Sequence, residues 1–453
     1  MKEEFAMKQC RMWSWMLPVT LLLMQGVGWV HAEEAYHITQ KAWNALGNEQ
    51  WGEVVRLADH AERTWGALAR KENQELKELP RGNQARKYAN LNELATILYV
   101  KGEAMRKKGD RVAALAAYRK LERDYTYGQC WDNGGWWWQP AASGRDAMAR
   151  LDPKMQVEVS IKAPPLSPEL RLPGKKGVCF SLRPLTDRRG GTWKENIPRI
   201  KALNASWNYS WGSEYVDVQP KELEFLPMAW GAWSTDGLRK DLAKNVIPRI
   251  KSGEVKRFLG FNEPDKWDQA NMSYQAALKY WPVLEALNVP LCSPACANPE
   301  SVEDDSIQGV KGTWMRDFMR EADKRGYRID YIGVHWYGST GAHSFKTKLA
   351  SIYELYGRRP LLVTEFSPAD WSAKKLTDND HSPQDVLEFM KVVVPWMEQQ
   401  DWIAGYAWFS FEHYQAVGTS SSLFDPAGNL TPLGRFYASV TPENPSGDQT
   451  ISY

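Results

Sequence analysis

Residues 256–267 read Lys-Arg-Phe-Leu-Gly-Phe-Asn-Glu-Pro-Asp-Lys-Trp and decide the fold of the larger part of this chain. The short apolar run at 258–261 stops at Asn262, Glu263 and Pro264. Pro264 has no backbone N–H to offer a β-ladder, so a strand over this run ends before it. An apolar strand with polar side chains at its carboxyl end is typical of a parallel barrel, where functional groups lie just after the strands.

A second apolar run farther along the chain also ends on a carboxylate. Residues 360–366 read Pro-Leu-Leu-Val-Thr-Glu-Phe, so Glu365 follows a strand as Glu263 does. Two carboxylates at one barrel rim can protonate a glycosidic oxygen and attack the sugar carbon, which is what glycoside hydrolysis requires. We therefore expect Glu263 to be the general acid/base and Glu365 the nucleophile.

From residue 176 onward, short apolar runs alternate with helical patterns, which indicates a parallel α/β fold. Eight strands are expected, at 177–182, 205–211, 224–230, 257–261, 289–293, 331–336, 361–366 and 403–409. Helices are expected at 237–252, 273–287, 313–325, 344–356 and 385–399. This count predicts a (β/α)₈ TIM barrel over residues 176–440, followed by a tail at 441–453.

Residues 33–150 carry helical periodicity and little strand signal. Segments 51–58 and 111–118 each follow another helix across a Gly-containing turn. The pattern resembles tetratricopeptide helix pairs, although the offset of about 60 residues exceeds the usual period of about 34. We expect a small all-α tetratricopeptide-like domain that packs on the rest of the chain or binds a protein partner.

A tryptophan-rich loop closes this helical region. Trp136, Trp137 and Trp138 follow two glycines within 128–140. They either seal an interface or offer a stacking surface for carbohydrate, and the interface is favoured because exposed aromatic patches of that size are uncommon. Five prolines then indicate a semi-rigid linker at 151–175.

Residues 1–32 have the pattern of a signal peptide. Lys2, Lys8 and Arg11 precede an apolar run, and the small residue Ala32 offers a cleavage site. The run is short and broken for a membrane span, which needs about 20 apolar residues, so an uncleaved anchor is the less favoured alternative. We expect a secreted or periplasmic protein.

Composition argues against several classes of partner and cofactor. With 57 Lys and Arg against 55 Asp and Glu, a nucleic-acid-binding surface is not expected. After Cys10 in the leader, Cys130, Cys179, Cys292 and Cys296 form either two disulfide bridges or buried thiols, and buried thiols are favoured. Cys292 and Cys296 lack a second pair at zinc-site spacing, so we expect no metal and no other cofactor.

Polar and aromatic side chains gather where the expected strands end, which predicts a pocket. Asn262 can donate to the sugar 2-hydroxyl, and His335 or Tyr337 can hold Glu365 ionised and oriented. Trp408 is expected to be the floor beneath the sugar. The other candidates for substrate binding are Trp207, Tyr209, Trp211 and Trp230.

Each candidate also has a plainer interpretation. A single strand-end glutamate more often makes a salt bridge than catalyses, and it is the pairing of Glu263 with Glu365 that favours catalysis. His335 fits a buried core imidazole equally well. The tryptophans can instead plug the top of the barrel.

Several motifs stand in order along the barrel region. They are Pro-Met-Ala-Trp-Gly at 227–231, Gly-Phe-Asn-Glu-Pro-Asp at 260–265, Gln-Ala-Asn-Met-Ser at 269–273, Gly-Val-His-Trp-Tyr-Gly at 333–338, Val-Thr-Glu-Phe at 363–366, Tyr-Ala-Trp-Phe-Ser at 406–410, Ser-Leu-Phe at 422–424 and Leu-Thr-Pro-Leu-Gly at 430–434. Together they resemble the catalytic core of glycoside hydrolase family 128. The resemblance implies a clan-A type barrel and retaining, endo-acting hydrolysis of a β-1,3-glucan substrate. It also implies that Glu263 and Glu365 have the roles given above and that Tyr337 and Trp408 lie in the substrate cleft.

One motif departs from the family pattern. Ser210 stands between Tyr209 and Trp211, where relatives often carry Asn, and Asn208 would point to the same side of a regular strand as Ser210. Substrate contacts at this strand are therefore open, whereas both carboxylates are in place. The competing hypothesis is a carbohydrate-binding or scaffold protein, which needs no such pair of glutamates.

Overall fold

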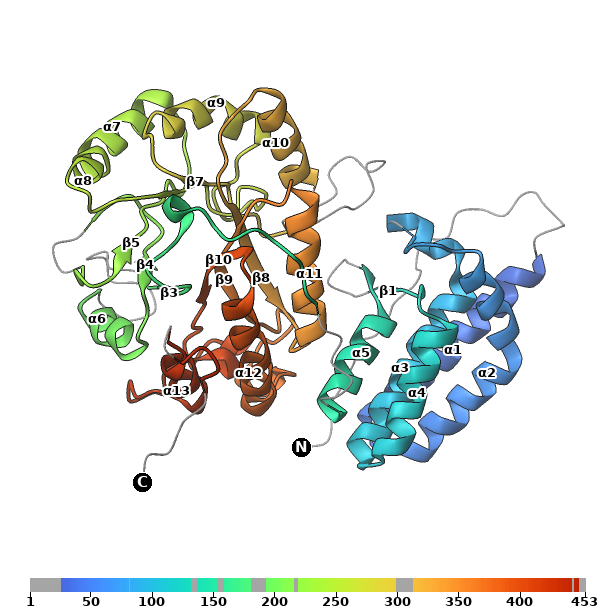
Figure 1. The fold of residues 1–453 in the computed structure, drawn as a ribbon. Coiled ribbons are helices and arrows are strands. Elements are labelled where there is room, and N and C mark those ends of the chain that lie inside the picture. The colour runs from blue at the N-terminus through green and yellow to red at the C-terminus, as the bar shows by residue number, and fades with distance from the viewer. Residues whose placement is uncertain are drawn as a thin grey trace. The chain divides into compact units, whose positions relative to one another are not determined.

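A computed structural model describes residues 26–80, 82–131, 137–152, 159–180, 193–215, 219–298, 313–441 and 444–447. The chain forms two compact units, Met1–Glu158 and Val159–Tyr453 (Figure 1). Residues 1–25 of the predicted signal peptide lie outside the described residues, and cleavage after Ala32 stays a prediction. Among the described helices, none combines the length and apolarity that a membrane span requires.

The described part of the first unit consists of helices and one short hairpin. The elements are α1 (Gly26–Gly47), α2 (Trp51–Gln74), η1 (Gly82–Lys87), α3 (Ala89–Lys108), α4 (Arg111–Asp124), β1 (Cys130–Trp131), β2 (Trp137–Trp138) and α5 (Pro140–Leu151). Gly109 ends α3 with a positive φ of 86°, and the Asp110 carboxylate caps α4 by accepting from the Ala113 N–H. The predicted helical region is confirmed, while its tetratricopeptide character stays a prediction.

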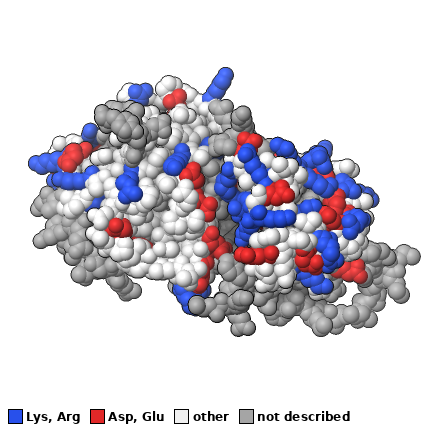
Figure 2. All heavy atoms as spheres, turned by 90° about the horizontal axis from the view of Figure 1, so that it is seen from below, with Lys and Arg blue, Asp and Glu red and all other residues white. Residues whose placement is uncertain are grey.

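The described tryptophans of the predicted Trp-rich loop pack within this first unit. The β1–β2 hairpin pairs Cys130 with Trp138, and the Trp138 ring lies 5.3 Å from that of Tyr99 on α3. Trp131 and Trp137 contact each other edge to face, with ring centroids 5.2 Å apart. Trp136 lies outside the described residues. Basic and acidic side chains are interspersed over the helical unit on the face shown in Figure 2.

The described part of the second unit is built on eight parallel strands. They are β3 (Lys176–Cys179), β4 (Trp207–Tyr209), β5 (Glu224–Phe225), β6 (Phe258–Leu259), β7 (Leu291–Cys292), β8 (Ile332–Gly338), β9 (Leu361–Pro368) and β10 (Ile403–Trp408). Six of them pair in the order β5-β4-β3-β10-β9-β8, and β6 pairs with β7. Parallel bridges from Met228 to Leu259 and from Cys292 to Tyr331 join the two groups, so the strands close into a barrel. The predicted (β/α)₈ fold is confirmed.

Helices surround this barrel (Figure 1). They are α6 (Trp193–Ala202), α7 (Thr235–Asn245), α8 (Ile247–Lys251), α9 (Tyr274–Glu285), α10 (Thr313–Lys324), α11 (Ala342–Leu355), α12 (Pro383–Gln399) and α13 (Pro432–Ser439). Four begin with a hydroxyl cap, from Ser234, Ser273, Ser382 and Thr431. The single helix expected at 237–252 is instead two, since Pro248 removes a backbone donor at the junction.

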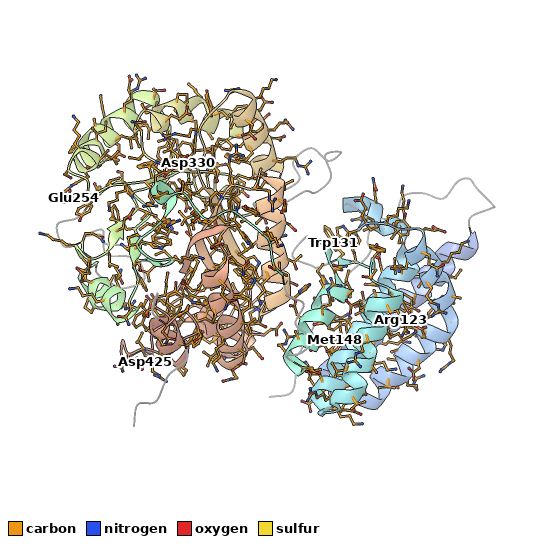
Figure 3. All side chains as sticks on the ribbon, in the orientation of Figure 1. Arg123, Trp131, Met148, Glu254, Asp330 and Asp425 are labelled. Atoms are coloured by element: carbon orange, nitrogen blue, oxygen red, sulfur yellow. The ribbon has the colours of Figure 1, made fainter. Side chains whose placement is uncertain are left out.

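Two apolar layers distinguish the inward and outward faces of the strands. Inward residues such as Leu259, Leu362 and Ala404 form one cluster inside the barrel. Outward residues such as Phe258 and Val363 belong to a larger cluster shared with the helices. Figure 3 shows side chains filling the space between strands and helices. Alternation along each strand therefore decides which side chains reach the barrel interior.

The predicted linker at 151–175 is wrong for its second half, which packs on the barrel. Leu166, Leu170 and Leu172 cover the inner apolar cluster at the amino-terminal ends of the strands. Buried Arg257 ties this segment down by donating to the Arg171 carbonyl while it pairs with Glu224 at 2.6 Å. Although it contains prolines, this segment is not an extended spacer, because it packs against the barrel. Residues 153–158 lie outside the described part.

Three cysteines of the barrel unit are buried free thiols: Cys179, Cys292 and Cys296. The alternative of two disulfide bridges among Cys130 and these three is therefore wrong. Their side chains lie in the apolar clusters inside and outside the strands, where cysteine behaves as a small hydrophobic residue.

Candidate active site

Glu263 is positioned by the irregular end of strand β6. Its backbone N–H donates to the Ala295 carbonyl at 2.7 Å, and the Asn262 N–H donates to the Trp230 carbonyl at 3.0 Å. Glu263 itself has a φ of 38°, which is a left-handed conformation that costs a non-glycine residue about 1–3 kcal/mol. Hydrogen bonds on both sides hold this turn, and Glu263 is nearly fully buried.

Glu365 faces the barrel interior because strand β9 contains a β-bulge. Leu361 and Val363 point outward, so regular alternation would send residue 365 outward as well. The register shifts between Val334 and His335 on the neighbouring strand, and His335 then pairs with Glu365. The extra residue at Thr364 turns the carboxylate inward.

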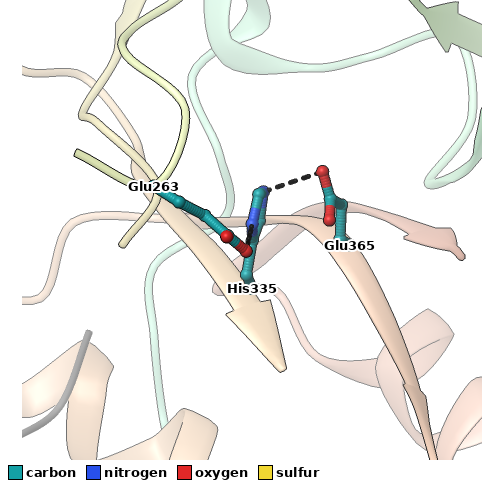
Figure 4. Close-up of side chains that lie close together, drawn as sticks. All are labelled: Glu263, His335 and Glu365. Carbon is teal, nitrogen blue, oxygen red and sulfur yellow. Dashed lines mark hydrogen bonds and ion pairs between the residues drawn. The ribbon is translucent and has the colours of Figure 1, made fainter. Parts of the chain in front are cut away.

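His335 lies between the two carboxylates. It shares the inward face of β8 with Tyr337, while Val334 points outward. Its Nδ1 lies 3.0 Å from Oε1 of Glu263, and its Nε2 lies 3.4 Å from Oε1 of Glu365 (Figure 4). The imidazole side chain is fully buried. A chain of carboxylate, imidazole and carboxylate therefore links the turn after β6 with the strands β8 and β9.

Three neutral donors hold Glu365. Tyr209 donates to Oε1 at 2.8 Å, the Trp211 indole N–H donates to the same oxygen at 2.7 Å, and Tyr337 donates to Oε2. Burial and the charge of Glu365 raise the pKa of Tyr209 and of Tyr337 well above the ordinary value. Both phenols therefore stay protonated and remain donors to this carboxylate.

Glu263 and His335 shift each other's pKa in opposite directions. Burial raises the pKa of Glu263, but the hydrogen bond and charge of His335 and the charge of Lys266 lower it more, and the net shift is downward. Burial lowers the pKa of His335, whereas the charge of Glu365 and the hydrogen bond to Glu263 raise it more, and the net shift is upward. Both shifts favour the ionised carboxylate beside the protonated imidazole.

The same three residues are the one group of metal-ligand types found among the described residues. One atom each of Glu263, His335 and Glu365 lies within 4.8 Å of the others. Those atoms are already engaged, since Oε1 of Glu263 faces His335 and Oε1 of Glu365 accepts from Tyr209 and Trp211. This arrangement is suited to proton transfer, and we assign no metal to it.

Asn262 directly precedes Glu263, and its backbone N–H donates to the Trp230 carbonyl. Buried Asn262 donates to the Gln269 side chain at 3.2 Å, and its own side-chain oxygen has no partner among the described residues. Trp230 is half-buried and packs on Trp233, with ring centroids 6.2 Å apart. Asn208, on the opposite side of β4 from Tyr209, is fully buried.

Two predicted sugar-binding residues cannot contact a substrate. Trp408 is fully buried in the outer apolar layer, and its indole N–H donates to the Ser421 carbonyl. Trp207 points into the barrel but fills its lower interior, where its N–H donates to the Lys175 carbonyl at 2.9 Å. Neither ring offers a free face, so the prediction of Trp408 as the sugar floor and of Trp207 as a substrate contact is wrong.

Sequence reasoning missed two residues at this site. Lys266 lies 3.7 Å from Oε2 of Glu263, and Trp371 on the loop after β9 packs its ring against that of Tyr337 at 5.7 Å. Lys266 stands three residues after Glu263, a spacing at which the two side chains can form an ion pair and from which the contact could have been predicted. Trp371 carries no local signal, because its position depends on the course of its loop.

Comparison with known proteins adds a family model and several solved structures. The model described as glycosyl hydrolase catalytic core matches residues 190–437. None of the curated proteins matches the chain. An endo-β-1,3-glucanase of glycoside hydrolase family 128, subgroup I, from Amycolatopsis mediterranei is 28% identical, with 59% of this chain and 99% of that chain covered and a TM-score of 0.46.

Two further solved structures come from other subgroups of family 128. A subgroup II endo-β-1,3-glucanase from Sorangium cellulosum is 26% identical, with 59% of this chain and 98% of that chain covered and a TM-score of 0.43. A subgroup VI exo-β-1,3-glucanase from Aureobasidium namibiae is 23% identical, with 59% of this chain and 97% of that chain covered and a TM-score of 0.44.

Proposed function

Because this chain belongs to the glycosyl hydrolase catalytic core family, we propose that it is a retaining endo-β-1,3-glucanase. Glu263 is its general acid/base and Glu365 its nucleophile. In the first step Glu365 attacks the anomeric carbon, the glycosidic C–O bond breaks, and Glu263 protonates the leaving oxygen. In the second step Glu263 takes a proton from water, which attacks the glycosyl-enzyme and releases Glu365.

The single observation that carries this proposal is the gap between the two carboxylates. An oxygen of Glu263 and an oxygen of Glu365 lie within 4.8 Å of each other. Retaining glycosidases have carboxyl groups about 5–5.5 Å apart, whereas inverting enzymes leave about 6.5–9.5 Å for a water molecule. The short gap supports direct attack by Glu365.

The partners of Glu365 support its role as the nucleophile. Tyr209, Trp211 and Tyr337 donate to it and are neutral, so they hold an anion in place without competing for its charge. A nucleophile must stay ionised and aimed at the sugar carbon, and this set of donors supplies both conditions.

His335 supplies the link that lets Glu263 change roles. Glu263 must donate a proton in the first step and accept one in the second. Its hydrogen-bonded neighbour is an imidazole whose pKa is raised, so a proton is stored one hydrogen bond away from the carboxylate. Glycosylation removes the charge of Glu365. The pKa of His335 then falls, because that charge raises it in the free protein.

The choice of β-1,3-glucan and of internal cleavage rests on the sequence motifs. The residues at 260–265, 333–338 and 363–366 resemble those of family 128 and carry Glu263, His335, Tyr337 and Glu365. We further propose secretion to the periplasm or beyond, on the basis of the predicted signal peptide. A protein partner for the helical unit stays a prediction.

Activity on defined substrates tests the function. Purified protein is incubated with β-1,3-, β-1,4- and mixed-linkage β-glucans, and reducing ends and product lengths are measured over time. We expect the wild type to release reducing ends from β-1,3-glucan, with early products of mixed lengths, which marks internal cleavage. The Glu365→Gln variant should release no reducing ends. Binding of glucan without any hydrolysis would instead favour the carbohydrate-binding alternative.

A further inference from the structure

Lys266 places a second cation on Glu263. His335 approaches Oε1 of the carboxylate, while the Lys266 ammonium lies 3.7 Å from Oε2. The lysine is partly exposed, and its ammonium also lies 3.6 Å from Asp268. Each oxygen of the proposed acid/base therefore faces a different positive group, one beneath it in the barrel and one beside it on the loop after β6.

Trp371 holds this lysine from the opposite catalytic loop. The Lys266 ammonium lies over the Trp371 ring, 5.6 Å from its centroid, at cation–π distance. The same ring packs edge to face on Tyr337, which donates to Glu365. Contacts therefore run in a closed circuit from Glu263 through Lys266, Trp371 and Tyr337 to Glu365, and back through His335.

Half-buried Asp265 and buried Asp370 fix the two loops that carry this contact. The Asp265 carboxylate accepts from the backbone N–H groups of Ala297 and Asn298 at 2.8 and 3.0 Å. The Asp370 carboxylate accepts from the N–H groups of Ser372 and Asp380, each at 3.0 Å. Lys266 and Trp371 each follow one of these anchors directly, so the backbone beneath both side chains is held.

We infer that Lys266 is a positioning residue that keeps Glu263 ionised and aimed between the two chemical steps, and that Trp371 clamps Lys266 in place. The inference rests on the proposed function, because it gives the lysine a role in the second step, where Glu263 must be an anion to accept a proton from water. A cation at Oε2 favours that anion, and the proton that Glu263 gives to the leaving oxygen in the first step is replaced by the one it takes from water in the second.

The groups around Glu263 set the sign of the effect. His335 on β8 and Lys266 on the loop after β6 lower its pKa, and Glu365 on β9 acts through His335. Asp265 and Asp268 are the neighbouring acids on the same loop. Removing Lys266 removes one of the two cations, so the pKa of Glu263 must rise while the other groups stay in place.

A titration of Glu263 in the free protein tests the inference. Protein labelled with ¹³C at the glutamate carboxyl carbons is titrated by NMR, and the signal of Glu263 is identified by its loss in Glu263→Gln. We expect Lys266→Met to raise the pKa of Glu263 and Trp371→Ala to raise it by less. Lys266→Arg keeps the charge and should leave it close to the wild-type value.

Lys391→Met is the matched control, since Lys391 also pairs with a glutamate three residues away, at 3.1 Å from Glu388 on the outside of α12. We expect no change in the pKa of Glu263 in this variant. An unchanged pKa in Lys266→Met overturns the role of the lysine, and an unchanged pKa in Trp371→Ala overturns the clamp.

A pH profile adds the catalytic readout. The alkaline limb of the kcat/KM profile reports the pKa of the general acid in the free enzyme. This limb should lie at higher pH in Lys266→Met than in the wild type, and at the wild-type position in Lys266→Arg. A limb that stays in place in Lys266→Met contradicts the inference. If the wild-type protein hydrolyses no β-glucan, the proposed function fails, while the titration still decides whether Lys266 controls Glu263.

Discussion

Glu263 and Glu365 face each other across one gap, but their partners are of different kinds. Glu365 accepts from two phenols and an indole, all neutral, whereas Glu263 lies between an imidazole and an ammonium group. Neutral donors stabilise an anion at every pH at which they stay protonated. Partners that carry or exchange protons make the state of the carboxylate depend on pH and on its neighbours.

This difference separates the two chemical roles before any substrate binds. A nucleophile needs a fixed charge, and the donors to Glu365 are two phenols whose pKa is raised and an indole. An acid/base catalyst needs a proton that can come and go, and Glu263 shares one with His335. Substitutions of the two carboxylates and of their partners test that division, and the largest effect is expected for Glu365.

Glu365→Gln removes the charged carboxylate that attacks the sugar carbon. We expect kcat on β-1,3-glucan to fall by about 10⁴-fold or more, because no covalent intermediate can form. Glu398→Gln is the control, since Glu398 also accepts from a buried tyrosine, Tyr406, at a distance from the site. A loss in Glu365→Gln no larger than that in Glu398→Gln would remove Glu365 as the nucleophile.

Glu263→Gln should affect substrates according to their leaving groups. We expect kcat/KM on glucan to fall by about 10²–10⁴-fold, the usual contribution of general acid catalysis. An aryl glycoside with a strongly acidic phenol needs no protonation, so its first step should be nearly unaffected and its burst of phenol should remain. Equal losses on both substrates would show that Glu263 is not the acid.

Tyr337→Phe should weaken the hold on the nucleophile without removing its charge. Hydrogen bonds to charged groups are worth about 1.5–3 kcal/mol, so we expect kcat/KM to fall by about tenfold to a hundredfold. The matched variant Tyr406→Phe removes a buried phenol that donates to Glu398. It should lower the free energy of unfolding but leave kcat/KM unchanged, and similar activity losses in both variants would contradict the role of Tyr337.

His335→Asn should change how stability depends on pH. The folded pKa of His335 is raised above its ordinary value of 6.5, so its contribution is fully present below about pH 6.5 and is lost as pH rises through the folded pKa. We expect the free energy of unfolding of the wild type to fall over that interval and the variant to lack this component. Urea unfolding at several pH values measures it.

Exposed His60 on α2 provides the control for this smallest effect. His60→Asn should retain the wild-type fall in the free energy of unfolding above about pH 6.5, because it leaves the buried imidazole in place. If His335→Asn shows the same fall as the wild type, the imidazole does not gain its proton from the two carboxylates.

The sequence predicts where the barrel strands end, because the physical signals there are local. Pro264 stops a ladder, and the apolar runs before Glu263 and Glu365 are long enough for strands. Glu263 could therefore be placed after a strand without a structure, whereas β9 continues beyond Glu365 to Pro368. The regular alternation on β8 likewise puts His335 and Tyr337 on one face.

Departures from regular strands explain what the sequence could not predict. A bulge on β9 turns Glu365 inward, and a register shift between Ile403 and Gly405 on β10 turns Trp408 outward into the helix layer. Each shift depends on pairing with a neighbouring strand, which local patterns do not encode. Lys266 and Trp371 meet through two loops whose course is set by tertiary hydrogen bonds.

The stereochemistry of the first product tests the central claim most directly. ¹H NMR spectra taken in the first minutes of β-1,3-glucan hydrolysis, before mutarotation, report the configuration of the newly formed reducing end. Attack by Glu365 across the short gap to Glu263, followed by attack of water, predicts the β-anomer as the first product. Initial formation of the α-anomer would mean that water attacks directly, and would contradict the assignment of Glu365 as the nucleophile.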